Sequence, residues 1–321
     1  MTTMTDDSRP LIVVCGEALV DLFVRPETNG LIDVSARLAG APFNLAIGIA
    51  RLGGRSALAA GLSSDMFGHA LINQLHAENV DTNFIETYDA PTNLAVVGRN
   101  AKNEPTYDFP VKESADLNLQ LIHVHDALKP IAAITFGSYL MAFPKSQQAL
   151  LSVLRQRQAQ SLICLDPNIR LGMISDPLVW RHALEIFVSL CDIIKASDED
   201  IEAIYPHEDQ DQIAKRILEQ GPQLFIITRG KEGISAWHKS GTSVTLESHK
   251  IDVMDTVGAG DSFLAAFLIY LQKNDVLQKS RLADMSYDTL VAALNYANRA
   301  AAITCSRFGA DLPRHSDLAE I

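Results

Sequence analysis

The sequence predicts an α/β protein in which a mainly parallel sheet is covered by helices on both faces. From about residue 120 onward, short apolar runs alternate with longer segments of helical spacing, an order that builds repeated βαβ units. The apolar runs are continuous, as expected of strands buried on both faces of a parallel sheet. With 321 residues, 47% of them hydrophobic, the chain can form one large core, and we expect a single domain over residues 1–321.

The first expected strand, Leu11–Cys15, ends at Gly16. Residues 17–38 and 92–112 contain polar breaks and a polar turn, which predict short strands of a small β lid. Further strands are expected at Ala57–Gly61, Ile131–Thr135, Leu162–Leu165, Asp192–Lys195, Leu224–Thr228 and Ile234–Trp237. Helices are expected at Asn44–Leu52, Phe67–His76, Ser146–Gln158, Leu178–Leu190, Asp211–Gln220, Asp261–Gln272 and Tyr287–Thr304. The polar stretch Asn274–Asp288 is expected to be a surface excursion.

Charge and cysteine content restrict the function and the location. The chain has 27 Lys and Arg against 39 Asp and Glu, a net charge of −12, which argues against non-specific binding to nucleic acid or anionic membranes. No apolar run approaches the ~20 residues that span a bilayer, and the amino terminus has no signal-peptide pattern. Four scattered cysteines without a Cys-x-x-Cys pair indicate reduced thiols. We therefore expect a cytoplasmic protein.

The stretch Asp255–Phe263 carries the strongest chemical signal. It follows an extended segment, Lys250–Met254, which we expect to be a strand, and it precedes an apolar helix. Glycines at such a junction let the backbone approach a ligand, and the first amides of the helix form an anion site. Asp261 in this turn either takes a proton from an attacking hydroxyl or simply favours the first helical turn, as acids do. The chain has no Gly-x4-Gly-Lys-Ser/Thr motif, and a dinucleotide fingerprint would need Gly at Phe263.

Asp-Thr-Val-Gly-Ala-Gly-Asp-Ser-Phe resembles the second signature of the ribokinase-like (pfkB) family of carbohydrate kinases. The resemblance extends from near residue 11 to Pro313. It implies a ribokinase-like three-layer α/β/α sandwich with a small β lid, and an ATP-dependent kinase that uses Mg²⁺. In that family the aspartate of this motif is the catalytic base, which assigns Asp261 to this role, and the adjacent Gly258, Ala259 and Gly260 form the anion site.

The same resemblance implies a sugar site. Gly16–Asp21 is similar to the opening of fructokinase-type sugar kinases, and Asn44 lies in a segment similar to the family's first signature, with Ala39 where the family has glycine. Asn44 has a second interpretation as a plain helix N-cap. The substrate-binding residues that the resemblance implies are Asp21, Gly40, Asn44, Asn168 and Arg170.

On the nucleotide side the resemblance implies ATP contacts by Ser197, Thr228, Gly230, Gly233 and Asn298. Ser197-x-x-Asp200 replaces an Asn-x-x-Glu motif linked to Mg²⁺, so Asp200 would reach the metal through water; an N-capped helix is the alternative interpretation. Relatives bind K⁺ through backbone oxygens, which suggests Asp255 and Val257 here. His123-Val124-His125, expected on one face of a strand, lacks a third ligand and is not taken as a metal site.

Within the family the chain looks most like fructokinase, and this resemblance implies D-fructose as the acceptor. The alternatives are 2-keto-3-deoxygluconate, a nucleoside, and a non-catalytic sugar-binding regulator. A sugar acid would need cationic side chains for its carboxylate, and Arg170, Arg99 and Lys112 are the candidates. In relatives such lids often pair between subunits, so the expected partners are the sugar, ATP and a second copy of the chain.

Overall fold

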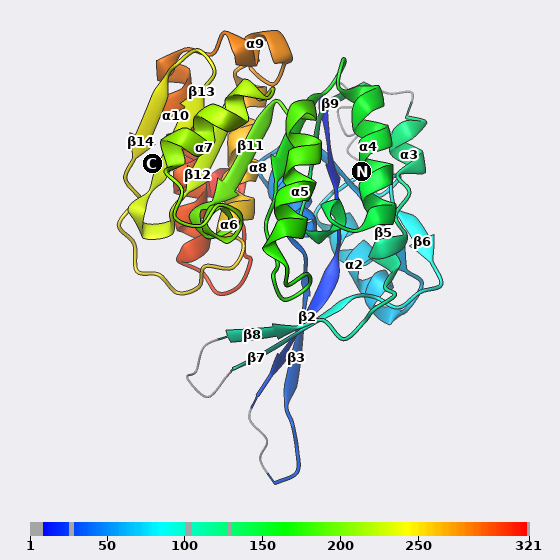
Figure 1. Cartoon of the computed structure of the whole chain (residues 1–321). Coiled ribbons are helices and arrows are strands. Elements are labelled where there is room, and N and C mark those ends of the chain that lie inside the picture. Colours follow the sequence, from blue (N-terminus) through cyan, green and yellow to red (C-terminus); the bar gives the residue numbers. More distant parts are fainter. Residues whose placement is uncertain (1–8, 26–28, 100–104, 128–129, 320–321) are drawn as a thin grey trace.

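The structure, a computed structural model, describes residues 9–25, 29–99, 105–127 and 130–319, with the backbone alone for residues 99 and 105–107. A central sheet with helices on both faces forms the body, and a small second sheet projects from one edge of it (Figure 1). The α/β class and the three-layer sandwich predicted from the sequence are confirmed.

Within the described residues the central sheet has eight strands, and six neighbouring ones run parallel. In spatial order the strands are β14 (Ser243–Leu246), β13 (Ile234–His238), β12 (Leu224–Thr228), β11 (Ile193–Ser197), β10 (Leu162–Asp166), β9 (Ile131–Gly137), β1 (Leu11–Cys15) and β4 (Arg55–Ala59). Strands β13 and β14 continue the sheet in antiparallel order. Because parallel strands end at the same edge, the residues that follow them gather there.

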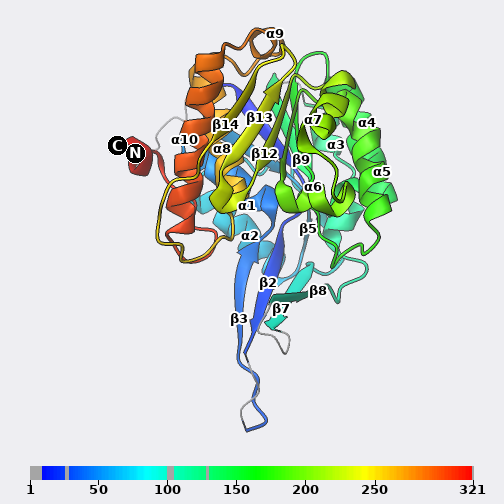
Figure 2. The ribbon, with the colours of Figure 1, turned by 60° about the vertical axis from the view of Figure 1, so that its left-hand side comes forward.

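Helices cover both faces of the central sheet (Figures 1 and 2). One layer contains α3 (Ile122–His125), α4 (Pro144–Arg157), α5 (Pro177–Phe187), α6 (Asp198–Ile204) and α7 (Gln210–Glu219). The other contains α1 (Ala41–Arg51), α2 (Met66–Ala77), α8 (Ala259–Lys273), α9 (Lys279–Ala283) and α10 (Tyr287–Cys305). The shorter elements are β5 (Gly61–Ser63), β6 (Glu86–Tyr88), α11 (His315–Ala319) and the 3₁₀ turns η1 (Ala115–Asn118), η2 (Tyr139–Met141), η3 (Val188–Leu190) and η4 (Gly230–Glu232).

Strand β1 shows how the central sheet divides the core. Leu11, Val13 and Cys15 pack against the first helix layer, whereas Ile12 and Val14 pack against the second. All five side chains are buried, and burying an aliphatic side chain of this size contributes about 1.5–3 kcal/mol. A strand with apolar side chains on both faces therefore reads as a continuous apolar run.

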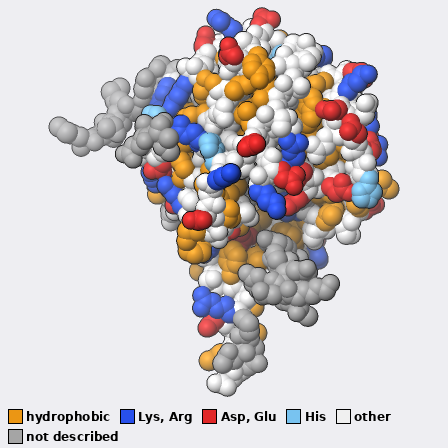
Figure 3. All heavy atoms as spheres, turned by 90° about the vertical axis from the view of Figure 1, so that its left-hand side faces the viewer, with side chains coloured by type: hydrophobic (Ala, Val, Ile, Leu, Met, Phe, Trp, Pro, Cys, Tyr) orange, Lys and Arg blue, Asp and Glu red, His pale blue; other side chains and the backbone are white. Residues whose placement is uncertain are grey.

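The lid is a four-stranded sheet in the order β3 (Val34–Ala39), β2 (Leu19–Val24), β7 (Leu94–Arg99) and β8 (Pro105–Asp108). Its strands come from the two segments for which the sequence predicts a lid. Strand β2 continues from β1, so the lid starts at the carboxyl edge of the central sheet (Figure 1). In the space-filling view of Figure 3 the lid stands out from the body.

The expected strand at Lys250–Met254 is wrong. The segment is irregular, and Met254 donates its amide to the carbonyl of Cys305 at the end of α10, at 2.8 Å. Val253 is 61% exposed and Met254 is 50% exposed. An apolar segment at the surface, tied to a helix end, has no neighbouring strand to extend.

Two further local predictions are wrong. His123 and His125 lie in the short helix α3 and not in a strand, so their side chains do not share a face; His125 pairs with Asp126. The segment Asn274–Asp288 contains helix α9 and buries Leu277 and Leu282, so it contributes to the core.

None of the described helices is long and apolar enough to cross a membrane, and the four cysteines are free thiols, three of them buried.

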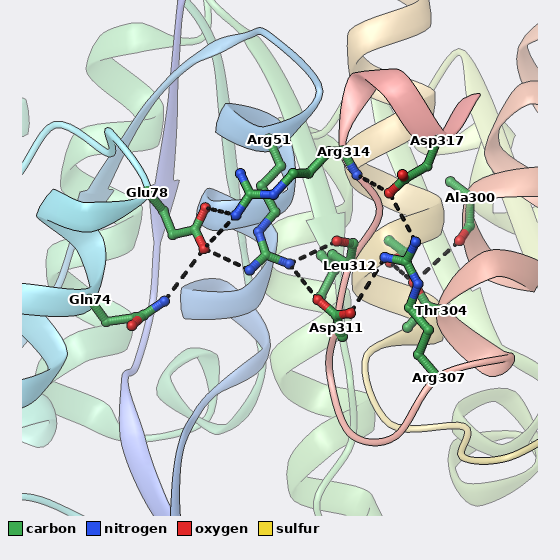
Figure 4. A network of polar contacts seen from close by, with 11 residues as sticks. Arg51, Gln74, Glu78, Ala300, Thr304, Arg307, Asp311, Leu312, Arg314 and Asp317 are labelled. Carbon is green, nitrogen blue, oxygen red and sulfur yellow. Dashed lines mark hydrogen bonds and ion pairs between the residues drawn. The ribbon is translucent and has the colours of Figure 1, made fainter. Parts of the chain in front are cut away.

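A network of ion pairs fixes the carboxyl-terminal segment to the body (Figure 4). Arg51 at the end of α1 donates to Glu78 at 2.6 Å and to Asp311 at 2.9 Å, and it also binds the carbonyl of Leu312 at 2.8 Å. Arg314 reaches the same Glu78 carboxylate at 3.2 Å. Glu78 is therefore the acceptor that joins α1, α2 and the carboxyl-terminal segment.

We expect Glu78→Gln to lower the free energy of unfolding by roughly 2–4 kcal/mol at pH 7, because it leaves two guanidinium groups without their buried anion. The hydrogen bond from Arg51 lowers the pKa of Glu78 below its ordinary value of 4.5. A carboxylate with a lowered pKa stabilises the fold at higher pH and loses that contribution on acidification, so the difference between the proteins should shrink below about pH 4.5.

Urea denaturation at pH 7 and pH 4 measures this difference. Glu208→Gln is the matched control, since it removes an ion pair with Arg216 that is largely exposed and should cost less than about 1 kcal/mol. Equal losses in the two variants would contradict a special role for Glu78.

Candidate active site

A cleft lies at the carboxyl edge of the central sheet, where β1, β9 and β10 end. Its lining combines apolar strand and helix residues with polar groups at the strand ends: Val14, Cys15, Ala41, Pro42, Leu45, Thr135, Phe136, Gly137, Ser138, Asp166, Asn168 and Asp261. Open α/β sheets bind their ligands at this edge.

The glycine turn before α8 has the geometry that the sequence predicts for an anion site. Gly258 is the N-cap with φ 80°, a left-handed conformation, and a Cβ there would lie 2.8 Å from the Ala310 side chain. Helix α8 begins at Ala259, so its first amides lie at the positive end of a long helix without partners inside it. A Cβ on Gly260 would lie 2.9 Å from Nζ of Lys195, so the ammonium lies directly beside the turn.

Asp261 lies in the first turn of α8 and faces the cleft. Nδ2 of Asn44 donates to its Oδ2 at 2.9 Å, across 217 residues of sequence. Burial raises the pKa of Asp261 to about 6, against the hydrogen bond from Asn44 and the charge of Lys195, which lower it. A carboxyl with this pKa is ionised at neutral pH and can still accept a proton readily.

Asn44 is not a helix N-cap, because α1 begins three residues earlier with Gly40 as its cap. Gly40 has φ 118°, and a Cβ there would lie 2.9 Å from the carbonyl oxygen of Glu17. Ala39 is the last residue of β3 and pairs with Leu19, so a methyl group fits where the family pattern has its first glycine. The turn at Gly40 thus directs the start of α1 toward Asp261.

A buried ion pair lies on the other side of Asp261. Nζ of Lys195, in the middle of β11, is 2.7 Å from Oδ2 of Asp166, at the end of β10. Although burial disfavours the ammonium, the Asp166 carboxylate raises the pKa of Lys195, with smaller contributions from Asp200 and Asp261. Lys195 therefore remains charged, and its positive charge acts on the carboxylates of Asp166, Asp200 and Asp261.

Asp21, on the lid strand β2, faces Arg37 on β3 in the register of the lid. Burial raises the pKa of Asp21 to about 6, while the charges of Arg170 and Arg37 lower it. Arg170 also acts on Asp261 and Asp166, so it lies among the carboxyl groups of both sides of the cleft. Asn168 lines the cleft with φ 41°, a strained backbone for a residue other than glycine.

The predicted nucleotide-side residues lie after β11, β12 and in α10. Thr228 donates to the carbonyl of Ala196 at 3.4 Å, and Asn298 donates to the carbonyl of Glu247 at 2.9 Å. Gly230 and Gly233 have φ 48° and 95°, and a Cβ on Gly230 would meet open space. Arg229, before Gly230, binds Gln210 at 3.4 Å.

Ser197 and Asp200 form a reciprocal capping box at the start of α6. Oδ2 of Asp200 accepts from the amide of Ser197 at 2.9 Å, and Oδ1 accepts from the amide of Ile169 at 2.7 Å. With both oxygens engaged, direct metal ligation by Asp200 does not fit; contact through water does. The carboxylate of Asp255 binds the amides of Val257 at 3.2 Å and Gly309 at 2.9 Å, which fixes this loop beside the glycine turn.

Two residues at the cleft, Lys195 and Asp166, were not predicted from the sequence as site residues. A signal for Lys195 was present, because a lysine interrupts the apolar run of β11. Glu17 was recognised only as part of a motif, although it is buried to 2% exposure. Arg99, a proposed clamp for a sugar acid, has its side chain outside the described residues.

Known proteins resemble this chain in sequence and in fold. A fructokinase of Rhizobium leguminosarum bv. trifolii is 33% identical over 87% of this chain and 85% of its own length. The crystal structure of an uncharacterized sugar kinase from Pyrococcus horikoshii has a TM-score of 0.79 at 28% identity and covers 97% of both chains. A fructokinase from Xylella fastidiosa with bound ATP has a TM-score of 0.83 at 24% identity and covers 96% of this chain and 97% of its own.

The model of the pfkB family of carbohydrate kinases matches residues 9–317, nearly the whole chain. The protein therefore belongs to the pfkB carbohydrate kinase family and is a sugar phosphotransferase.

Proposed function

We propose that the chain is an ATP-dependent kinase that transfers the γ-phosphoryl group to a primary hydroxyl of D-fructose and gives fructose 6-phosphate. The observation that carries the proposal is the partly buried carboxyl of Asp261, which lies in the cleft at the amino end of α8. The names of the relatives support the acceptor, since the R. leguminosarum and X. fastidiosa proteins are both called fructokinase. The ATP bound to the X. fastidiosa protein supports the donor.

Asp261 acts as the general base. Asn44 occupies Oδ2, so we assign Oδ1 to the sugar hydroxyl, whose proton it takes as the oxygen attacks the phosphorus. The pKa of about 6 keeps the carboxyl ionised at neutral pH. The amides of Ala259, Gly260 and Asp261 and the nearby charge of Lys195 stabilise the negative charge on the transferred group.

The remaining site residues divide between the two substrates. We assign Asp21, Gly40, Asn44, Asn168 and Arg170 to the sugar, and Ser197, Thr228, Gly230, Gly233 and Asn298 to ATP. Mg²⁺, contacted by Asp200 through water, would neutralise phosphate charge. Backbone oxygens at Asp255 and Val257 would hold K⁺, an ion that is bound in a crystal structure of a Vibrio cholerae fructokinase double mutant.

A sugar acid suits this cleft less well than fructose. Of the proposed clamps, Lys112 donates to the carbonyl of Phe109 at 3.4 Å, and Arg170 is matched by several carboxyl groups. A coupled assay of ADP formation with fructose, 2-keto-3-deoxygluconate, adenosine and inosine tests the assignment. Turnover with fructose is expected; turnover with another acceptor only, or tight binding of a sugar without turnover, would overturn it.

A cytoplasmic location stays a prediction.

The lid also supports a homodimer. Three large apolar side chains on it are exposed, Leu31 by 73%, Ile32 by 58% and Val34 by 52%. Strand β3 is an edge of the lid sheet, and an exposed apolar edge favours pairing with another strand.

We expect Asp261→Asn to lower kcat by about 10²-fold or more, because the amide cannot take the proton, while fructose and ATP still bind. Steady-state kinetics and calorimetric titration measure the two effects. Asp21→Ala is the contrast, since it removes ground-state contacts and should raise the KM for the sugar. An unchanged kcat in Asp261→Asn would remove Asp261 from the role of base.

Lys195→Met should raise the pKa that governs the acidic limb of the kcat/KM pH profile above the wild-type value of about 6. Burial already raises the pKa of Asp261, and the variant removes a positive charge that opposes this. Lys195→Met with Asp166→Asn is the matched control, because it also removes the negative charge that Lys195 neutralises. The pKa of the acidic limb in this double variant should lie closer to the wild-type value. The same pKa in the wild type, the single variant and the double variant would argue against electrostatic coupling.

Ile32→Asp should convert a dimer into a monomer, because a charge would replace an apolar side chain in the lid contact. Sedimentation equilibrium measures the mass, with Leu178→Asp, a similarly exposed apolar position on α5 and outside the lid strands, as the control. A wild-type monomer at micromolar concentration would refute the proposed dimer.

A further inference from the structure

A buried polar cluster lies where the lid joins the body, and no step proposed above uses it. Its members are Glu17, Asn93, Asp116 and Tyr139, all 2% exposed or less. The hydroxyl of Tyr139 donates to Oδ2 of Asp116, and Nδ2 of Asn93 donates to the Tyr139 oxygen at 3.0 Å and to Oδ2 of Asp116 at 3.3 Å. Ser138, which lines the cleft, hydrogen-bonds the Glu17 carboxyl.

The cluster contains residues from three of the four chain segments that connect body and lid. Glu17 precedes β2, Asn93 precedes β7, and Asp116 follows β8. The fourth connection is Gly40, where a Cβ would lie 2.9 Å from the carbonyl oxygen of Glu17.

Backbone hydrogen bonds join the same connections. Val20 at the start of β2 donates to the carbonyl of Asn93 at 3.1 Å, and Ala115 donates to the carbonyl of Pro91 at 2.9 Å. A displacement within the cluster would therefore move all the lid strands together.

The two acids of the cluster carry an excess of acceptors. Among the described atoms, Oε2 of Glu17 and Oδ1 of Asp116 accept no hydrogen bond of regular geometry, although both are buried. Two ionised carboxylates at such a place would repel each other and lack donors. One proton on the pair removes the repulsion and supplies a donor.

Burial is the main reason to place that proton on Glu17. It raises the pKa of Glu17 to about 8, and the Asp116 charge also raises it, whereas the hydrogen bonds from Ser138 and from the Glu17 backbone amide and the charge of Arg170 lower it. Asp116 receives two hydrogen bonds at Oδ2, which favour its ionised form although burial raises its pKa. Burial raises the pKa of Tyr139 well above its ordinary value, so the phenol stays neutral.

We propose that the Glu17–Asp116 pair forms a joint that fixes the position of the lid relative to the body. This joint positions Asp21 for the sugar only while Glu17 keeps its proton. Asp21 lies on β2, four residues after Glu17, so the joint directly precedes the strand that carries the sugar contact. Glu17 and Asp116 are positioning residues, and their role rests on the sugar kinase activity proposed above.

The first test is the pH dependence of the sugar KM between pH 6.5 and 9.5. In the wild type we expect KM to rise by about tenfold per pH unit above about pH 8, with kcat nearly constant, because loss of the proton releases β2. Glu17→Gln keeps a neutral donor and should show a wild-type KM at pH 7 without the alkaline rise. Glu86→Gln is the control: this buried glutamate already accepts from two backbone amides, at 2.9 and 2.7 Å, and its variant should keep the rise.

An alkaline rise that persists in Glu17→Gln, or one carried by kcat, would overturn the proposal.

The second test needs no activity. Hydrogen–deuterium exchange of the wild type, corrected for the intrinsic pH dependence, should show less protection of β2 and β7 at pH 9 than at pH 7. The buried strands β10 and β12 serve as internal references. Unchanged protection of the lid would refute the joint even if no sugar is phosphorylated, whereas failure of the kinase assay alone would affect only the proposed function.

Discussion

The active site depends on how the buried carboxyl groups at one edge of the sheet are neutralised. Strands β1, β10 and β11 deliver Glu17, Asp166 and Lys195 to this edge, and the glycine turn adds Asp261. Like charges this close in a poorly solvated cleft cannot all remain ionised without compensation. Lys195 compensates on the side of the glycine turn, Arg170 acts between the two sides, and a proton compensates at the lid joint. Because their charges are neutralised in different ways, these similar carboxyl groups can have different roles.

The glycines have a related role, because two of them lie where a backbone or a charged group must pass closely. Gly40 leaves room for the carbonyl of Glu17, and Gly260 leaves room for the Lys195 ammonium. One glycine thus brings the lid connection against α1, while the other brings a cation against the anion site. Alanine at either position would separate groups whose electrostatic coupling depends on short distances.

Much of the fold could be predicted from the sequence, because strands such as β1 bury both faces and leave a continuous apolar run. Asp261, Asn44 and the glycine turn were found through a motif in which neighbouring residues act together. Lys195 and Asp166 were missed because their pairing joins two neighbouring strands across 29 residues of sequence, a contact that local spacing does not indicate. The irregular segment before the glycine turn was mistaken for a strand because apolar residues at a surface loop resemble those of a strand.

The lid joint illustrates a further limit of local patterns. Glu17, Asn93 and Asp116 are ordinary polar residues in the sequence, and each would be taken for a strand end or a turn. Only the fold shows that they are buried together, and burial changes what a carboxyl group does: it makes protonation at neutral pH favourable. A proton held there acts together with the apolar contacts that Leu19, Ala39 and Ala95 at the base of the lid make with the core. The position of Asp21 over the cleft therefore depends on charge balance as much as on packing.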